Sequence, residues 1–463
     1  MEKNQLVSVR IADISQNGEG IGHVCAGADE GFTVFVKDTV PGDLADVRII
    51  KLKKNYAYGR LMRVTEPSED RVPEACPEAR RCGGCQLQAM SREAQLRMKT
   101  EKVRNDLERI GHFDDVSSMM KEILASGHTY RYRNKAMYPV AEDRNGEPVA
   151  GFYAGRTHQV ISCTDCLLEP ETNADILRII LGWMKKHHVP VYDETTRRGL
   201  VRHILIRQGF ATGEILVCLV INGNGIPAAG DLISKLEQID GMTGITYCVQ
   251  TKPVNTVMTD KIGTIWGLPY ITDILRSEKF GISARYRISP NSFYQVNHEM
   301  AEKLYEKVLE NAALTGSETV MDLYCGAGTI SLFLASKARR VIGVEVVPQA
   351  VRDARINAEL NGTANAFFYE GKAEEIVPKL YEEEHVHADV VVVDPPRKGC
   401  DAALLQTILR MKPDRLIYVS CDPATLARDL RILVDGGFRI KNVQPCEQFN
   451  QTVHIESMAS LEF

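Results

Sequence analysis

The chain has 463 residues, of which 61 are acidic and 56 basic, and its net charge of −5 excludes a uniformly basic nucleic-acid coat protein, although not a local basic surface. With 44% hydrophobic and 25% charged residues, the composition is typical of a soluble globular protein. This length exceeds what one hydrophobic core usually organises, so we expect two or three domains. No apolar run approaches the ~18 residues of a membrane helix and no secretory signal is visible, which predicts a cytoplasmic protein with reduced cysteines.

Residues 1–66 consist of short alternating strands separated by glycine-rich turns, a pattern that predicts a small β-barrel of the oligonucleotide-binding kind. The last segment of this region, 47–64, is basic, contains no acidic residue and has Tyr56 and Tyr58 among its charges. Its basic residues are Arg48, Lys51, Lys53, Lys54, Arg60 and Arg63. Such a strip suits phosphate contact and base stacking, although a solvated strand face explains it equally well.

Residues 67–290 alternate strand-like runs with few helices, which predicts a central, mostly-β or α+β domain. Near its start, Cys76, Cys82 and Cys85 form a C-x5-C-x2-C motif in which two glycines let the chain wrap tightly. Either Cys163 or Cys166 can supply a fourth thiolate. Four thiolates suit a structural zinc ion or an iron–sulfur cluster, and the spacing does not choose between them.

The segment YRYRNKAMY belongs to the same central region and carries three basic residues at alternate positions. Arg131, Arg133 and Lys135 are therefore predicted to lie on one face of a strand. That face would either extend the basic surface of the first domain or form a solvated edge.

Residues 291–463 alternate nearly continuous apolar strands with helices, which predicts a parallel sheet covered on both faces. The last two strand-like runs, FRIKNVQP and TVHIESMASL, have no helix between them. We therefore expect an antiparallel hairpin at the edge of this sheet.

Two acidic residues in this region are predicted to end strands, where open α/β sheets bind ligands. The first strand runs into the glycine turn 325–328, and Glu345 ends the second strand, which favours a nucleoside-type cofactor. Asp394 directly follows four valines. A purely structural turn would explain Pro395 and Pro396, which follow Asp394, but it would not explain the acidic residue itself.

Cys421 is predicted to follow the next strand, beside Asp394, where it is either a small core residue or a nucleophile. A helix beginning at Pro423 would lower the pKa of this thiol below the free value of ~8.5. Glu456 belongs to the final strand. Although a Glu on an edge strand is usually solvated, its apolar neighbours suggest that it points inward.

Taken together, the motifs CPEARRCGGCQLQ, ISPNSFYQVN, DLYCGAGTISL, DPPRKG, YVSCDPATLARDL and HIE occur in an order that resembles the RNA (uracil-5-)-methyltransferase family. The resemblance is to the form with an N-terminal TRAM domain and a [4Fe–4S] cluster. It implies a multidomain α/β protein, with a TRAM barrel at 1–66 and a central domain with the cluster loop at 67–290. Residues 291–463 would form a Rossmann-like, class I S-adenosylmethionine-dependent methyltransferase domain.

The resemblance also assigns roles to individual residues. It implies cluster ligands at Cys76, Cys82, Cys85 and Cys166, and S-adenosylmethionine contacts at Gln295, Tyr324, Glu345 and Asp394. Cys421 corresponds to the nucleophile that adds to C6 of uracil, and Glu456 to the base that removes the C5 proton.

The branch of the family that is specific for transfer RNA resembles a shorter form without the TRAM domain and the cluster, so the resemblance favours methylation of 23S ribosomal RNA. We also expect a cytoplasmic monomer that acts away from membranes. Two alternatives stay open: the same chemistry on transfer RNA, and a non-catalytic iron–sulfur protein that binds RNA. A redox or radical iron–sulfur enzyme would need an open ligand position, whereas here four cysteines can close the cluster.

Overall fold

The computed structural model describes residues 1–463, and the chain forms two compact units. Unit 1 comprises residues 1–100, 152–161 and 449–454, and unit 2 comprises the remaining residues. No helix in the structure has both the length and the apolar character needed to cross a membrane. The predicted division into domains 1–66, 67–290 and 291–463 stays a prediction.

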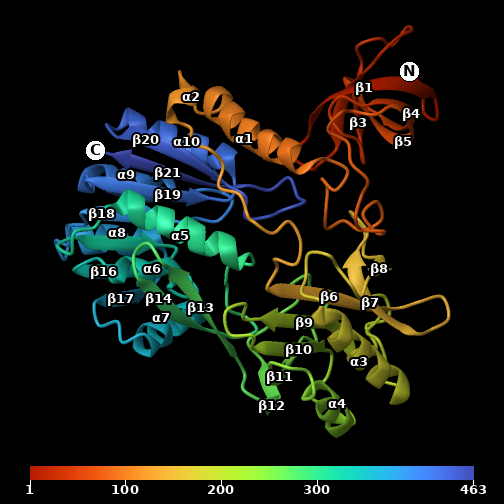
Figure 1. Ribbon diagram of the computed structural model, residues 1–463. Helices are drawn as coiled ribbons and strands as arrows, with labels where there is room; N and C mark the ends of the chain where they lie inside the picture. The colour runs from red at the N-terminus through yellow and green to blue at the C-terminus, as the bar shows by residue number, and fades with distance from the viewer. The chain divides into compact units, whose positions relative to one another are not determined.

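Unit 1 begins with a closed five-stranded barrel in the order β1-β2-β3-β5-β4 (Figure 1). Its strands are β1 (Leu6–Ile14), β2 (Gly20–Val24), β3 (Thr33–Val36), β4 (Leu44–Leu52) and β5 (Tyr56–Glu66). Alternate side chains such as Val9, Ile11, Val34 and Val47 are fully buried inside it, as the period of two in a strand requires. Closure removes the exposed edges of the sheet.

Residues 67–91 follow the barrel without a helix or a strand of their own and contain the three clustered cysteines. We refer to these residues as the cysteine loop. Helix α1 (Arg92–Arg109) follows the loop, and the short helix α2 (Val116–Met119) follows α1.

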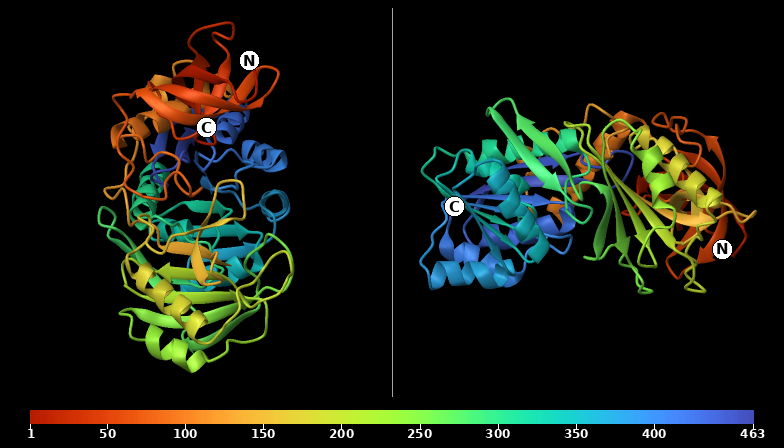
Figure 2. Two further views of the ribbon diagram at one scale, coloured as in Figure 1. Left: turned by 90° about the vertical axis from the view of Figure 1, so that its right-hand side faces the viewer. Right: turned by 90° about the horizontal axis from the view of Figure 1, so that it is seen from below.

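A seven-stranded mixed sheet forms the central region, in the order β12-β11-β10-β9-β6-β7-β8. Its strands are β6 (Lys135–Glu142), β7 (Pro148–Tyr153), β8 (Val160–Ser162), β9 (Val201–Gln208), β10 (Ile215–Ile221), β11 (Met242–Val249) and β12 (Ile262–Gly267). Helices α3 (Thr172–Lys186) and α4 (Ala229–Leu236) pack together beside it (Figure 2). A separate hairpin, β13 (Ile271–Ser277) and β14 (Ile282–Ile288), leads into the last region.

The prediction that Arg131, Arg133 and Lys135 share one face of a strand is wrong. Arg131 has a φ of 55°, which no strand permits, and β6 begins only at Lys135. The Arg131 guanidinium donates to the carbonyl oxygens of Cys166 and Glu169 at 2.9 and 3.0 Å. Arg131 therefore fixes the segment around Cys166, and the Arg133 guanidinium lies 3.5 Å from the Glu169 carboxyl group, so both arginines are paired within the protein.

The C-terminal sheet has seven strands in the order β17-β16-β15-β18-β19-β21-β20. Its strands are β15 (Thr319–Leu323), β16 (Arg340–Glu345), β17 (Ala366–Glu370), β18 (Val390–Val393), β19 (Arg415–Ser420), β20 (Arg439–Cys446) and β21 (Glu456–Glu462). The first five are parallel, and β21 runs antiparallel to both β19 and β20.

Helices cover both faces of this sheet. They are α5 (His298–Ala312), α6 (Thr329–Ala335), α7 (Pro348–Leu360), α8 (Ala373–Glu382), α9 (Ala402–Met411) and α10 (Pro423–Asp435). Val390 and Val392 pack in the core of α5, α6 and α7, whereas Val391 and Val393 pack in the core of α8, α9 and α10. Strand β18 is apolar on both faces because each face packs against a layer of helices. The predicted α/β class, with an N-terminal barrel and a Rossmann-like C-terminal sheet, is confirmed.

The last two strands form the expected antiparallel hairpin at the edge of the sheet. Within this hairpin β21 lies between β19 and β20, so β20 is the edge strand. Glu456, at the start of β21, is consequently inside the sheet and 3% exposed.

Candidate active site

Three of the predicted site residues meet at the carboxyl ends of the parallel strands of the C-terminal sheet. Asp394 directly follows β18, and Cys421 directly follows its parallel neighbour β19. Glu456 is the first residue of β21, and the next residue, Ser457, pairs with Ser420 of β19. Because β21 runs antiparallel, its beginning lies beside the carboxyl end of β19. The topology thereby places an acid, a thiol and a second acid together at the edge where such sheets bind ligands.

Glu456 is a buried carboxyl group in a site that already holds another acid. Burial raises its pKa well above the usual value, and the nearby Asp394 raises it further, while Arg397 acts in the opposite direction. Burial also raises the pKa of Asp394 to about 7. Two carboxyl groups with raised pKa values beside a thiol are an arrangement suited to proton transfer.

The pKa of Cys421 is raised to about 11, which contradicts the lowered value predicted from the helix that begins at Pro423. Burial is the main cause, and the carboxyl groups of Glu456 and Asp394 add to it. Asp422 caps the helix, and its Oδ1 accepts from the amides of Ala424 and Thr425 at 3.0 and 3.3 Å. The first amides of the helix are therefore occupied by a carboxylate instead of being available to the sulfur.

This raised pKa predicts slow alkylation of Cys421 in the free protein. Below its pKa the thiolate fraction rises about tenfold per pH unit, so iodoacetamide labelling should still be accelerating between about pH 7 and 9. Mass spectrometry of the Cys421 peptide measures this rate, with the exposed Cys25 as the reference in the same sample. Glu456→Gln removes a nearby carboxylate and should lower the pKa of Cys421. A labelling rate that levels off near pH 7 would contradict the assignment.

The turn after β15 and the end of β16 form the second part of the site. Tyr324 has a φ of 65°, and Gly326 and Gly328 have φ values of 55° and 77°. The Glu345 carboxylate closes the turn, accepting from the amides of Gly326 at 3.1 Å and Val347 at 2.8 Å. A Cβ at position 326 would meet no atom within 4 Å, so a ligand can approach this backbone closely.

Gln295 lies in the segment before α5 and not in either of these turns. The residue is 7% exposed, and its side-chain Oε1 accepts from Nε2 of Gln448 at 3.1 Å. Its carbonyl oxygen accepts from the Asn134 amide group at 2.8 Å. The structure therefore shows Gln295 as a buried, hydrogen-bonded residue, and its contact with a cofactor stays a prediction.

Sequence reasoning missed Asp322, which is fully buried near the end of β15. It accepts a hydrogen bond from Ser331 Oγ, and burial raises its pKa to about 7. Its charge also raises the pKa of Asp394. An acidic residue within the apolar run TVMDLY was the signal that could have found it.

A second network that sequence reasoning missed fixes the loop that follows Asp394. Asp429 is fully buried on α10, and its Oδ2 accepts from the Tyr418 hydroxyl at 2.6 Å and from the Cys400 amide at 2.9 Å. Thr425 Oγ1 donates to the carbonyl oxygen of Arg397 at 3.2 Å. The loop that carries Arg397 is thereby attached to the helix that follows Cys421.

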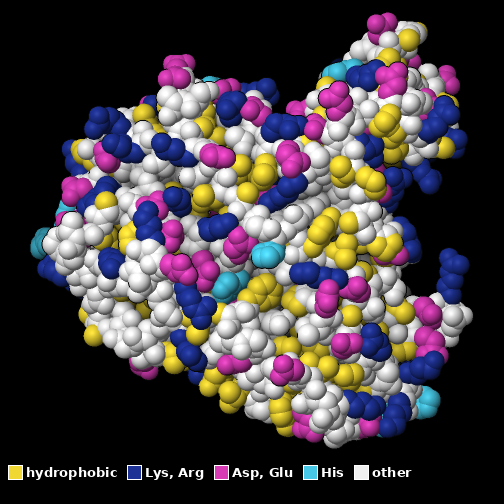
Figure 3. Space-filling model, viewed as in Figure 1, with side chains coloured by type: hydrophobic (Ala, Val, Ile, Leu, Met, Phe, Trp, Pro, Cys, Tyr) yellow, Lys and Arg dark blue, Asp and Glu magenta, His cyan; other side chains and the backbone are white.

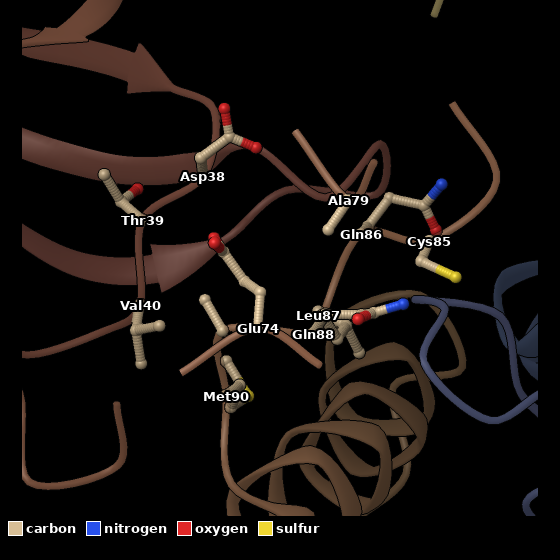
Figure 4. A pocket seen from close by; sticks show the side chains of 11 residues that line it. Asp38, Thr39, Val40, Glu74, Ala79, Cys85, Gln86, Leu87, Gln88 and Met90 are labelled. Atoms are coloured by element: carbon tan, nitrogen blue, oxygen red, sulfur yellow. The ribbon is translucent and has the colours of Figure 1, made fainter. Parts of the chain in front are cut away.

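The cysteine loop was predicted to hold a metal site, and its thiols lie in unit 1. The Cys82 thiol is near Cys76, and its Sγ accepts from the amide of Gly84 at 3.3 Å. Figure 4 shows the Cys85 sulfur pointing away from the carboxylates of Asp38 and Glu74. No group of three or more possible ligand side chains is close enough to hold a metal ion. Cys163 and Cys166 belong to unit 2.

Comparison with known families and relatives agrees with this geometry. Residues 265–462 match the family model described as tRNA (uracil-5-)-methyltransferase, and residues 2–62 match the TRAM domain. An uncharacterized RNA methyltransferase of Halalkalibacterium halodurans is 46% identical over 100% of this chain and 98% of its own length. One of Clostridium tetani is 40% identical over 100% of this chain and 97% of its own length.

A solved structure also matches nearly the whole chain. It is the Pyrococcus abyssi tRNA (uracil-54, C5)-methyltransferase in complex with S-adenosyl-L-homocysteine. The TM-score is 0.77 at 25% sequence identity, over 98% of this chain and 99% of the other. With full-length relatives at 40% identity or more and both family models matched in order, the chain belongs to the RNA (uracil-5-)-methyltransferase family in its TRAM-containing form.

Proposed function

We propose that this enzyme transfers a methyl group from S-adenosylmethionine to C5 of a uridine in RNA, with Cys421 as the nucleophile and Glu456 as the base. The observation that carries the proposal is the meeting of a thiol and a buried carboxyl group beside Asp394 at the ligand-binding edge of the sheet. The description of the Pyrococcus protein, a uracil C5-methyltransferase with S-adenosyl-L-homocysteine bound, supports the same chemistry here.

The chemistry explains why the site needs both residues. C5 of uracil is a weak nucleophile, and the bond from Cys421 Sγ to C6 converts the ring to an enolate that can attack through C5. C5 then carries both its original proton and the new methyl group. Glu456 removes that proton, the C5–C6 double bond forms again, and the C6–S bond breaks to release Cys421.

S-adenosylmethionine supplies the methyl group and, while bound, a positive sulfonium charge. The residues around the turn after β15 fit such a group, since Glu345 ends a strand where a carboxylate can accept from ribose hydroxyls. The backbone of Gly326 is open to a close ligand. Asp394 and Tyr324 follow the neighbouring strands β18 and β15. A positive charge near Asp394 lowers the pKa of Glu456 and of Cys421, which favours the forms that react.

We further propose ribosomal RNA of the large subunit as the substrate, because the chain combines a TRAM barrel with a cysteine loop. Transfer RNA is the alternative, favoured by the description of the Pyrococcus neighbour. Mapping 5-methyluridine in both RNAs of a strain that lacks this protein tests the choice. The modification should disappear from ribosomal RNA and return with the wild-type protein, but not with Cys421→Ala. Loss from transfer RNA alone would show that the alternative is right.

We also propose that Cys76, Cys82, Cys85 and Cys166 bind a [4Fe–4S] cluster. The donor set has the right chemistry, because iron–sulfur clusters are held by cysteine thiolates, and the amide of Gly84 already donates to Cys82 Sγ. Cys166 is preferred over Cys163 because it is Cys166 that directly precedes the Leu-Leu pair included in the family resemblance.

Anaerobically purified protein should then be brown and contain about four irons per chain. Cys166→Ala should lose the iron and the visible absorbance, and Cys163→Ala, the matched control, should keep both. Elemental analysis together with the absorbance spectrum measures the effect. Stoichiometric zinc without iron would refute the cluster, and iron lost only from Cys163→Ala would show that the fourth ligand was chosen wrongly.

A further inference from the structure

Two carboxyl groups of the candidate active site have no partner within the protein. Glu456 is 3% exposed and Asp394 is partly buried, yet neither side chain accepts a hydrogen bond or forms an ion pair. Strand β19 lies between the strands that carry them, so the two carboxyl groups flank Cys421. The acidic side chains on the surface differ, because in the left-hand part of Figure 3 they lie among Lys and Arg side chains.

Only one cation acts on this pair. Arg397 lowers the pKa of Glu456, whereas no cation lowers the pKa of Asp394. The other titratable groups that face the pair carry no positive charge, and they are Asp322, Tyr305, Cys421 and Cys446. Behind them, Glu345 acts on Asp322, and Lys307 acts on Cys446. The pair therefore has two carboxyl groups for one positive charge.

Two neighbouring carboxyl groups in such a setting hold on to a proton. Ionising both would place two negative charges side by side, without hydrogen bonds and away from water. A second positive charge at the site removes this restriction, because two cations then balance two carboxylates. S-adenosylmethionine carries such a charge on its sulfonium sulfur, whereas the sulfur of S-adenosylhomocysteine is a neutral thioether.

We propose that Asp394 and Glu456 together release one proton when S-adenosylmethionine binds, and that they release none when S-adenosylhomocysteine binds. This inference rests on the proposed methyl transfer and deepens it, because it assigns the moment at which Glu456 becomes able to act as a base. In the free protein the pair shares a proton with a single facing cation. With the methyl donor bound, both carboxyl groups are ionised.

The loss of the sulfonium charge then restores the affinity of the pair for a proton. Once the methyl group has moved to C5, Arg397 is again the only cation that acts on the pair. Glu456 takes the C5 proton, the electrons of the C5–H bond form the C5–C6 double bond, and those of the C6–S bond return to Cys421. The proton that the reaction yields overall therefore leaves the enzyme when the methyl donor binds, before the chemistry.

The test is isothermal titration calorimetry of the full-length protein with each of the two ligands at pH 7, in buffers of different ionisation enthalpy. The slope of binding enthalpy against ionisation enthalpy counts the protons released. We expect S-adenosylmethionine to release about 0.5–1 proton more than S-adenosylhomocysteine, since the amino and carboxyl groups that the ligands share cancel in the comparison. Affinity rises with pH wherever binding releases a proton. Between about pH 6 and 7 the affinity for S-adenosylmethionine should therefore increase up to about tenfold more than that for S-adenosylhomocysteine.

Variants identify the source of the proton. Glu456→Gln and Asp394→Asn should each abolish the difference between the ligands, because one carboxyl group then remains for one cation. Cys421→Ala should keep the difference, since the thiol is not its source. Glu462→Gln is the matched control, because Glu462 ends the same strand as Glu456 and is paired with Lys441 at 3.2 Å, and it should also keep the difference. Circular dichroism confirms that each variant is folded.

Equal proton release with both ligands would show that the proposal is wrong. So would a difference that disappears in Cys421→Ala but persists in Glu456→Gln, because the thiol would then be the source. Failure of the proposed function is a separate result: the unaltered protein would transfer no methyl group to RNA, although the difference in proton release, which is measured without RNA, would persist.

Discussion

Replacing Glu456 with glutamine should trap the enzyme on its RNA as a covalent complex that already carries the transferred methyl group. Cys421 can still add to C6, and C5 can still accept the methyl group, because neither step uses Glu456. The C5 proton then has no base to remove it, so the C6–S bond cannot break. General bases contribute about 10²–10⁴-fold to such steps, and turnover should fall by that factor.

A denaturing gel with a radiolabelled methyl donor detects the complex as protein-sized radioactivity that ribonuclease treatment shifts. Glu462→Gln is the control, because Glu462 ends the same strand and is paired with Lys441 near the surface. It should turn over normally and leave no complex. Normal turnover by Glu456→Gln, or an adduct without a methyl group, would remove Glu456 from the proposed mechanism.

Replacing Cys421 with alanine should abolish methyl transfer while RNA and S-adenosylmethionine still bind. Without the thiolate, C5 is never activated, so we expect a loss of at least about 10⁴-fold in turnover and no covalent complex. The double variant with Glu456→Gln should also form no complex, which establishes that Cys421 acts first. Methyl release assays and binding measurements on the same preparation separate the chemical effect from misfolding.

Cys446→Ala is the matched control for this variant. Cys446 is a fully buried thiol that pairs with Glu456 across the sheet, so it tests whether another sulfur near the base can serve as the nucleophile. It should retain methyl transfer and, combined with Glu456→Gln, should still form the adduct. An adduct that depends on Cys446 instead of Cys421 would contradict the assignment.

Much of this protein is predictable from its sequence because the relevant signals are local. The period of two in residues 1–66 predicts a barrel, and the valines before Asp394 predict a strand that is buried on both faces. The motifs DPPRKG and YVSCDPATLARDL identify the family, which the full-length relatives confirm. Membership in a family of methyltransferases also leaves no reason to retain a non-catalytic binding protein as the alternative.

The tertiary structure decided the features that depend on neighbours distant in the sequence. The insertion of β21 between β19 and β20 buries Glu456, because strand order is set by long-range pairing and not by local pattern. The pKa of Cys421 is raised because burial and two carboxyl groups outweigh the adjacent helix. Arg131 has a left-handed φ and therefore lies outside any strand. Its guanidinium donates to the carbonyl oxygen of Cys166 instead. The sequence by itself identified the residues that we propose to carry the chemistry, and only the fold determined which of them share an environment, because burial and electrostatic interactions depend on distances in space.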